Sequence, residues 1–113
     1  MKEIKAIIQP FMLQHVLDAL KQIPDMPGVT VSEVKGFGRG RAEHSDKSET
    51  AWGSKVVPKL KVETVVTDAM AGEVINAIQK FAHTGNIGDG KIFVYSVSQV
   101  IKIRTGESGQ VAL

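Results

Sequence analysis

The sequence predicts an α+β fold of the ferredoxin-like βαββαβ type, in which two helices cover one face of a four-stranded antiparallel sheet. The 113 residues amount to one domain, spanning 1–113. Stretches with the alternating pattern of strands and stretches with the period of helices follow one another in the order β-α-β-β-α-β. Two helices in this order pack together on a single face of the sheet.

The first half of the chain supplies a strand, a helix and a second strand. Residues 4–8 are mostly apolar, and Pro10 ends this strand because proline cannot donate a hydrogen bond to a neighbouring strand. A helix is predicted over about 12–23, where apolar residues recur at helical spacing until prolines and a glycine follow. The run 29–37 predicts the second strand. The apolar face of the helix consists of Leu13, Val16, Leu17 and Leu20.

The second half repeats this rhythm after a long polar segment, about 39–55. That segment has no hydrophobic period, and such long loops are mostly functional or disordered. Residues 59–66 alternate in character and predict the third strand. Thr67 or Asp68 can cap the second helix, which ends near His83 with a glycine just beyond it.

The chain closes with a glycine-rich loop over 84–91 and a fourth strand over 92–97. A short extended piece follows at 100–104, and 105–113 form a polar tail with a weakly apolar end. One layer of two helices cannot cover both faces of the sheet, so the other face should pack against further subunits. The apolar strand residues that suggest this homo-oligomer include Val31, Thr64, Val66 and Val94.

Composition excludes several classes of protein. The chain has no Cys and only three His, which removes disulfides, thiol nucleophiles and most metal sites. No apolar run approaches the roughly 18 residues of a membrane helix, and the mixed-charge start lacks the apolar core of a signal peptide. We therefore expect a cytoplasmic protein that is not itself a membrane protein and has no metal site.

The charge balance gives no support to a nucleic-acid partner. Fourteen Lys and Arg oppose 12 Asp and Glu, and aromatic residues make up only 5% of the chain. Nucleic-acid-binding domains of this fold usually display aromatic residues on the sheet face. Phe93 and Tyr95 alternate as such a face requires, but the sequence leaves open whether their side of the strand faces the helices.

Three cation-bearing segments lie beside tight turns or strand ends. Gly88–Lys91 can form a nest of backbone N–H groups for an anion with a lysine beside it, or simply a turn before a strand. The run 36–41 can approach phosphates or serve as a hinge. Lys102 and Arg104 share one side of an extended piece, as a phosphate contact or a solvated face. Their convergence at a subunit cleft would suit a phosphorylated small molecule.

No group of residues in the sequence gives a strong indication of a catalytic site. His44 lies near Asp46 and Glu49 in the polar loop, but no nucleophile–base pair can be derived from such a segment. If the protein were a slow nucleotide phosphatase, the general base that activates water would have to be Asp89 or Glu63. We expect that the protein is not an enzyme. An exposed Trp in the loop, Trp52, can anchor a partner protein or fold back onto the domain.

Five segments resemble the PII family of nitrogen-regulatory signal-transduction proteins, and together they cover almost the whole chain. The stretch Thr-Gly-Asn-Ile-Gly-Asp-Gly-Lys-Ile-Phe at 84–93 is the most specific of them. The resemblance implies a homotrimer with ATP or ADP in the clefts between subunits. It also implies a T-loop at about 38–56 that binds a membrane transporter or a cytoplasmic enzyme. The segments are 7–11, 34–39, 58–63, 84–94 and 101–107.

The same resemblance assigns site residues. The phosphates would lie on the 84–91 loop, with Arg39 reaching in from the T-loop, the two cations of 102–104 coming from a neighbouring subunit, and Thr30 and Val65 beside adenine. The implied nucleotide-binding residues are Thr30, Gly36, Phe37, Gly38, Arg39, Val65, Thr84, Gly88, Asp89, Gly90, Lys91, Lys102 and Arg104. The partner-binding residues in the T-loop are Arg41, His44, Thr50 and Trp52.

Two departures from the family pattern concern the second effector and the covalent switch. Relatives that sense 2-oxoglutarate carry Gln after Gly-Phe-Gly-Arg, and its oxygen helps to hold magnesium. Gly40 stands there in this chain and has no side chain to donate a ligand, although Lys59, which pairs with the oxoacid, is retained. The modifiable T-loop Tyr is replaced by Trp52, which has no hydroxyl. The sequence therefore predicts altered 2-oxoglutarate sensing, with a bicarbonate-responsive regulator of carbon uptake or efflux as the alternative.

Overall fold

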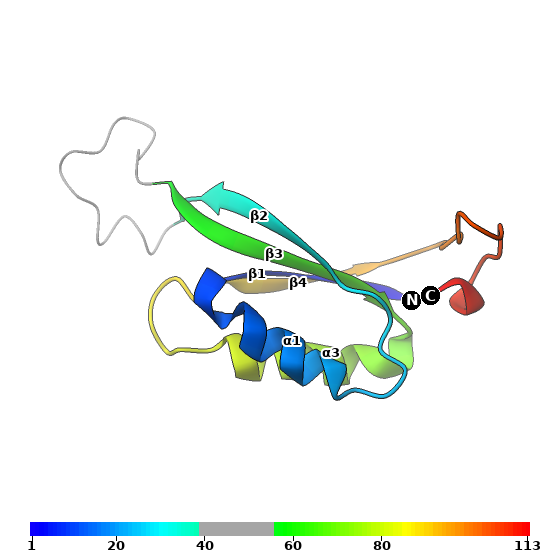
Figure 1. Ribbon diagram of the computed structural model, residues 1–113, viewed down its shortest axis with the longest axis horizontal. Coiled ribbons are helices and arrows are strands. Elements are labelled where there is room, and N and C mark those ends of the chain that lie inside the picture. Colours follow the sequence, from blue (N-terminus) through cyan, green and yellow to red (C-terminus); the bar gives the residue numbers. More distant parts are fainter. Residues whose placement is uncertain (39–55) are drawn as a thin grey trace.

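The computed structural model describes residues 1–38 and 56–113, and its element order is the predicted one (Figure 1). The predictions that fall on 39–55 lie outside the described residues. Short 3-10 helices, Pro10–Met12 and Gln110–Ala112, precede the first helix and end the chain. The main elements are β1 (Lys2–Ile8), α1 (Leu13–Lys21), β2 (Thr30–Gly36), β3 (Val57–Val66), α3 (Asp68–Ala82) and β4 (Lys91–Ser96).

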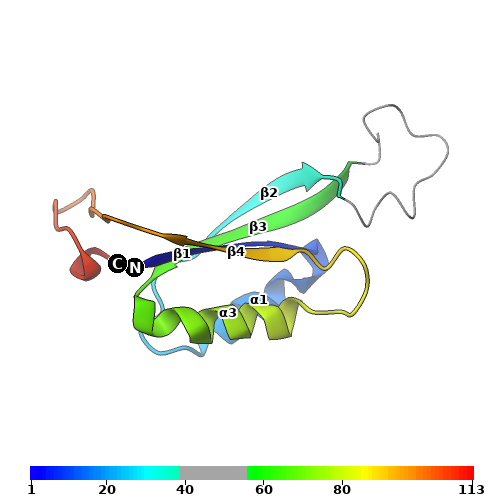
Figure 2. The ribbon, with the colours of Figure 1, turned by 180° about the vertical axis from the view of Figure 1, so that it is seen from behind.

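The four strands form one antiparallel sheet in the order β2-β3-β1-β4. Both α1 and α3 lie on one face of that sheet, and the view from behind shows the same single layer (Figure 2). This arrangement confirms the ferredoxin-like α+β prediction. The first strand of the chain is thus central, with β3 on one side and β4 on the other.

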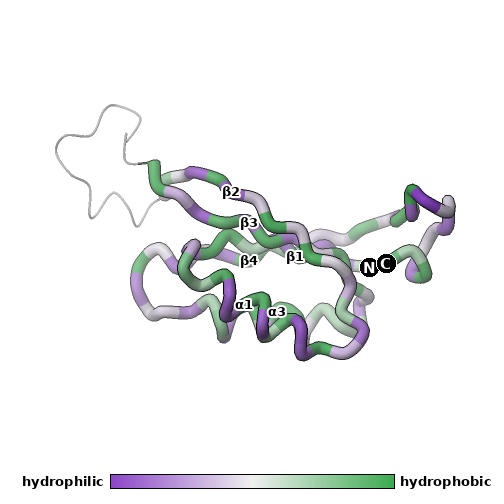
Figure 3. Tube along the Cα trace, in the orientation of Figure 1, coloured by the Kyte–Doolittle hydropathy of each residue, from purple (hydrophilic) through white to green (hydrophobic). Residues whose placement is uncertain are grey.

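The core fills the space between the helices and the sheet. Apolar and polar residues alternate along the strands and along both helices (Figure 3), so each element presents one apolar side to the core. The buried polar residue Thr64 donates its hydroxyl hydrogen bond to the Gly28 carbonyl at 2.9 Å, which meets the requirement that buried polar groups be paired. The fully buried side chains are Ile4, Ile8, Val16, Leu20, Val62, Val66, Val74 and Ile78.

Most predicted boundaries differ from the structure by one or two residues. The third strand begins at Val57 rather than 59, because its first residues pair with β2 alone through Val57–Gly36 and Lys35–Pro58. At Pro58 the strand has no neighbour on its other side, which is where a sheet tolerates proline. The first helix begins at Leu13 and ends two residues before the predicted 23.

The N-terminal cap of α3 is confirmed. The Thr67 hydroxyl accepts a hydrogen bond from the backbone N–H of Met70 at 3.3 Å, and the helix then runs without interruption to Ala82. His83 follows as the first extended residue.

The apolar residues used to infer a second uncovered face do not lie on it. Val31 pairs with Val62, and Ile4 pairs with both Thr64 and Val94, which puts all of them on the side that faces the helices. The residue pattern along the strands suggested two apolar faces, whereas the strand register puts these residues on one face. Val31 and Val94 remain 38% and 46% exposed because they lie on the edge strands, beyond the cover of the two helices.

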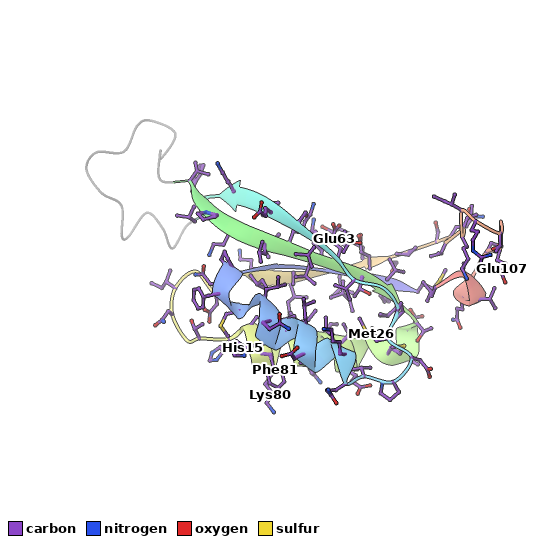
Figure 4. The ribbon with its side chains drawn as sticks, viewed as in Figure 1. His15, Met26, Glu63, Lys80, Phe81 and Glu107 are labelled. Carbon is purple, nitrogen blue, oxygen red and sulfur yellow. The ribbon has the colours of Figure 1, made fainter. Side chains whose placement is uncertain are left out.

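The face away from the helices is instead mixed in character. Phe93 and Tyr95 lie there, about two-fifths exposed, and the Lys5 ammonium stands 5.4 Å and 5.1 Å from their ring centres. Glu63 pairs across the sheet with Lys5 and lies on the same side (Figure 4). The sequence left open which face of the sheet carries Phe93 and Tyr95, and in the structure these aromatic rings point away from the helices.

The end of the chain forms a small hairpin arm, residues 100–109. Ile101 bridges to Ser108, and the backbone N–H of Lys102 donates to the Glu107 carbonyl at 2.8 Å. The predicted extended piece is therefore one side of a closed turn. Both the arm and the final 3-10 helix project from the end of the sheet opposite the 84–91 loop (Figure 1).

Replacing Gly72 by Ala is expected to raise the free energy of unfolding by about 1 kcal/mol, the usual gain of Ala over Gly inside a helix. Gly72 lies on the exposed side of α3, and an added Cβ meets nothing within 4 Å. Urea unfolding followed by circular dichroism measures the difference. A loss of stability would contradict the open surface seen at this position.

Candidate functional site

The loop between α3 and β4 is built around one carboxylate. Asp89 Oδ2 accepts hydrogen bonds from the backbone N–H groups of Thr84 at 2.8 Å and Gly85 at 2.9 Å. Its other oxygen accepts the Thr84 hydroxyl, and that hydroxyl in turn accepts the Asn86 N–H at 3.1 Å. Asp89 therefore shapes the loop from within, and Thr84 serves as its structural partner.

The charge of this carboxylate is stabilised where it lies. Burial opposes ionisation of Asp89, but the hydrogen bonds from Thr84 and Gly85 outweigh it and hold the pKa below its ordinary value. At neutral pH the carboxylate is ionised, and the loop keeps all of these bonds.

The backbone conformation of the loop requires glycine at two positions. Gly88 and Gly90 have φ angles of +102° and +100°, which residues with a side chain rarely adopt. Gly90 also presses against β1, since a Cβ there would lie 1.6 Å from the carbonyl oxygen of Ile7. The loop is thus fitted to the first strand by a residue without a side chain.

This loop forms one wall of a groove of about 700 Å³, a size that suits a small-molecule ligand. The opposite wall is the end of β2 and the residues that follow it, so two of the predicted glycine-rich segments meet here. Of the predicted nucleotide-binding residues, the groove collects Gly36, Phe37, Gly38, Gly88, Asp89, Gly90 and Lys91.

Lys59, the predicted effector-binding residue, also lines this groove. Its ammonium donates a hydrogen bond to the Gly88 carbonyl at 2.5 Å. Partial burial lowers the pKa of Lys59, and the nearby charge of Asp89 opposes that shift. The β3 strand is thereby tied directly to the glycine-rich loop.

Several groove residues were missed by the sequence reasoning. They come from the end of β1, the start of β3, the middle of β4 and the 84–91 loop itself, and only the register shows that the strand residues lie beside the loop. Gln9 is the clearest case, because its side-chain amide lies 2.9 Å from the position of a Cβ on Gly88. The missed residues are Ile7, Gln9, Val57, Asn86, Ile87 and Phe93.

Thr30 and Val65 lie in a different hollow, of about 350 Å³, together with two carboxylates, Glu3 and Glu63. Val65 is six residues beyond Lys59 on β3, about 20 Å along an extended strand. The structure therefore does not bring the predicted adenine contacts to the predicted phosphate loop within one chain.

The two remaining cations lie farther still from the groove. Lys102 and Arg104 belong to the hairpin arm at the other end of the sheet, and neither lines the groove or the smaller hollow. Five other predicted site residues, with the effector position Gly40, fall outside the described residues: Arg39, Arg41, His44, Thr50 and Trp52.

Across residues 1–38 and 56–113, no group of three or more His, Asp or Glu side chains is arranged to hold a metal ion. Among the helices in that part of the chain, none is both long enough and apolar enough to cross a membrane.

Comparison with known proteins gives matches over almost the full length. A family model described as "Nitrogen regulatory protein P-II" matches residues 1–107. The "Nitrogen regulatory protein P-II" of Rhodospirillum rubrum is 48% identical over 109 residues, 96% of each chain. The "Nitrogen regulatory protein GlnK" of Escherichia coli is 43% identical over 113 residues, 100% of each chain. A solved structure, "Crystal Structure of Arabidopsis thaliana PII bound to citrate", has a TM-score of 0.81 and 44% identity, covering 99% of this chain and 91% of that one.

Proposed function

The chain belongs to the nitrogen regulatory protein P-II family, and from this premise we propose that it binds ATP or ADP and controls a partner protein according to which nucleotide is bound. Members of this family are regulatory signal-transduction proteins rather than enzymes.

The glycine-rich loop carries the proposal. Gly88 and Gly90 have positive φ angles, which allow backbone N–H groups to turn toward an anion, and Lys91 adds a positive charge among the groove residues. Asp89 holds this loop from the inside, so the nest exists before any ligand arrives. A pre-formed site of this kind suits the phosphates of a nucleotide.

The separation of the predicted contacts supports a site shared between subunits. The groove with Lys91 lies at one end of the sheet, while Thr30, Val65 and the hairpin arm lie toward the other. In a homotrimer, the groove of one subunit would meet the smaller hollow and the arm of the next. The two cations of 102–104 would then face the phosphates that Lys91 holds.

The route to a partner begins at the groove wall. Phe37 and Gly38 line the groove and lead directly into the T-loop, about 38–56. A ligand that contacts this wall differently with two or three phosphates would bias the segment toward different conformations. The segment would then select the partner, a membrane transporter or a cytoplasmic enzyme, through Arg41, His44, Thr50 and Trp52.

The second effector is proposed to differ from the magnesium-bound 2-oxoglutarate of relatives. Gly40 has no side-chain oxygen to offer a metal, whereas Lys59 remains in the groove as a cation for a carboxylate. The Arabidopsis thaliana PII of the comparison was solved with citrate, another carboxylate ligand. Bicarbonate is the alternative anion for the same lysine.

Calorimetric titration tests the proposal. ATP, ADP and AMP would be titrated alone, with magnesium and 2-oxoglutarate, and with bicarbonate. We expect ATP and ADP to bind and 2-oxoglutarate to leave their affinity unchanged, because the metal ligand is missing at Gly40. A Gly40→Gln variant is expected to gain a magnesium-dependent response to 2-oxoglutarate.

The outcomes separate the parts of the proposal. No binding of any adenine nucleotide would overturn the ligand assignment. Cooperative binding of ATP and 2-oxoglutarate by the unchanged chain would contradict the altered-effector reading and restore ordinary nitrogen sensing. A Gly40→Gln variant without any gain would show that further residues block the oxoacid.

A further inference from the structure

The hairpin arm carries a carboxylate beside one of its cations. Glu107 Oε1 lies 3.7 Å from the Lys102 ammonium, across the turn that closes the arm. The same oxygen accepts a hydrogen bond from the Thr105 hydroxyl at 2.9 Å. That hydroxyl also accepts the backbone N–H of Glu107 at 3.2 Å. Thr105 therefore holds the carboxylate on the Lys102 side of the arm.

The ion pair is not what holds the arm together. The backbone supplies the closure, through Lys102 N–H to the Glu107 carbonyl at 2.8 Å and Gly106 N–H to the Lys102 carbonyl at 2.7 Å. Both side chains are at least one-third exposed, and exposed pairs of this kind add little to stability. The main effect of the carboxylate is therefore electrostatic, and it acts on any ligand that Lys102 contacts.

We propose that Glu107 is an internal counter-ion for Lys102 and that nucleotide phosphates must displace it to bind. This inference rests on the proposed nucleotide site and names a residue that sets its affinity. Without a ligand, Glu107 neutralises Lys102 in place. When a phosphate approaches, the carboxylate repels it and competes for the same ammonium, so affinity is lower than Lys102 alone would give.

The size of the effect follows from Coulomb's law. Two unit charges about 4 Å apart, as in the Glu107–Lys102 pair, interact in bulk water by an energy that corresponds to about a fivefold change in affinity, which is the upper end of what an exposed pair contributes. The penalty grows with the charge of the ligand, so it is larger for ATP than for ADP and absent for adenosine. Salt reduces it, because the arm lies at the surface.

The arm projects from the body of the subunit at the end of the sheet that does not hold the groove, and Glu107 lies out on it (Figure 4). Within one subunit, a change of this side chain therefore leaves the glycine-rich loop, Asp89 and Lys59 untouched. An effect on affinity that comes without a change in the free energy of unfolding can be assigned to the arm.

The decisive variant is Glu107→Gln, which removes the charge but keeps an oxygen for Thr105. Titration of ATP at low salt is expected to show about fivefold tighter binding than the unchanged chain, with a smaller gain for ADP and none for adenosine. Glu73→Gln is the matched control, since it removes the same charge from the exposed side of α3 and should leave affinity unchanged.

A double-mutant cycle separates a counter-ion from a structural role. In a Lys102→Met background, Glu107→Gln should keep only the part of its gain that comes from direct repulsion of the phosphates, because the carboxylate then has no ammonium to neutralise. An undiminished gain there, or weaker ATP binding by Glu107→Gln alone, would overturn the inference while the nucleotide site stands. An unchanged chain that binds no adenine nucleotide would overturn both.

Discussion

Replacing Lys91 with alanine is expected to weaken ATP binding by about tenfold to a hundredfold, the usual loss when a hydrogen-bonded charge is removed from a binding site. Lys91 is the only cation of the Gly88–Lys91 segment and lies where that segment enters β4, among the groove residues. The alanine side chain leaves the backbone path of the loop unchanged. The loss should therefore appear in affinity and not in the free energy of unfolding.

Calorimetric titration of ATP measures this effect, and Lys80→Ala supplies the control. Lys80 is an exposed lysine near the end of α3 whose ammonium lies over the Phe81 ring, outside the groove. The Lys80→Ala substitution removes the same charge from the chain and should leave the affinity for ATP unchanged. Equal affinity of the Lys91→Ala variant and the unchanged chain would remove Lys91 from the phosphate site.

The second large effect is expected from Gly90→Ala, which should both abolish nucleotide binding and destabilise the fold by about 3 kcal/mol or more. Two costs combine at this residue. The φ angle of +100° is unfavourable for alanine, and the new Cβ would overlap the Ile7 carbonyl oxygen at 1.6 Å. Because that oxygen belongs to the central strand, it has little room to move.

Gly85→Ala in the same loop separates the two costs. Gly85 has a similar φ angle of +90°, but its Cβ would meet only a side-chain atom of His83 at an ordinary 3.8 Å. It should cost about 1–2 kcal/mol, the price of the backbone conformation alone. Urea unfolding of both variants gives the comparison. Equal losses would show that contact with β1 contributes nothing at Gly90.

The fold was predictable because its strongest signals are local. The alternation along 59–66 and the cap at Thr67 depend on residues that are neighbours in the sequence, and both are found in the structure. The start of β3 at Val57 was not predictable, since it depends on whether Pro58 has one neighbouring strand or two. That is a property of the whole sheet.

The composition of the site was predictable only in part, for the same reason. The segments around Gly36 and Gly88 carry glycine patterns that suggest a loop near a ligand, and the structure brings them to one groove. Gln9 and Phe93 also line it, but nothing in their own surroundings in the sequence indicates this. The register between β1 and β4 decides it, and one residue of slip would turn Phe93 to the other face.

The central position of β1 has a consequence for how the chain is made. The strand β1 is synthesised before β4 but needs it as a neighbour, since Lys2 pairs with Ser96 and the glycine-rich loop closes against Ile7. Until β4 is synthesised, one edge of β1 stays open, as an unpaired edge that other chains could join. The groove, which takes residues from both β1 and β4, is therefore completed only after β4 has been synthesised.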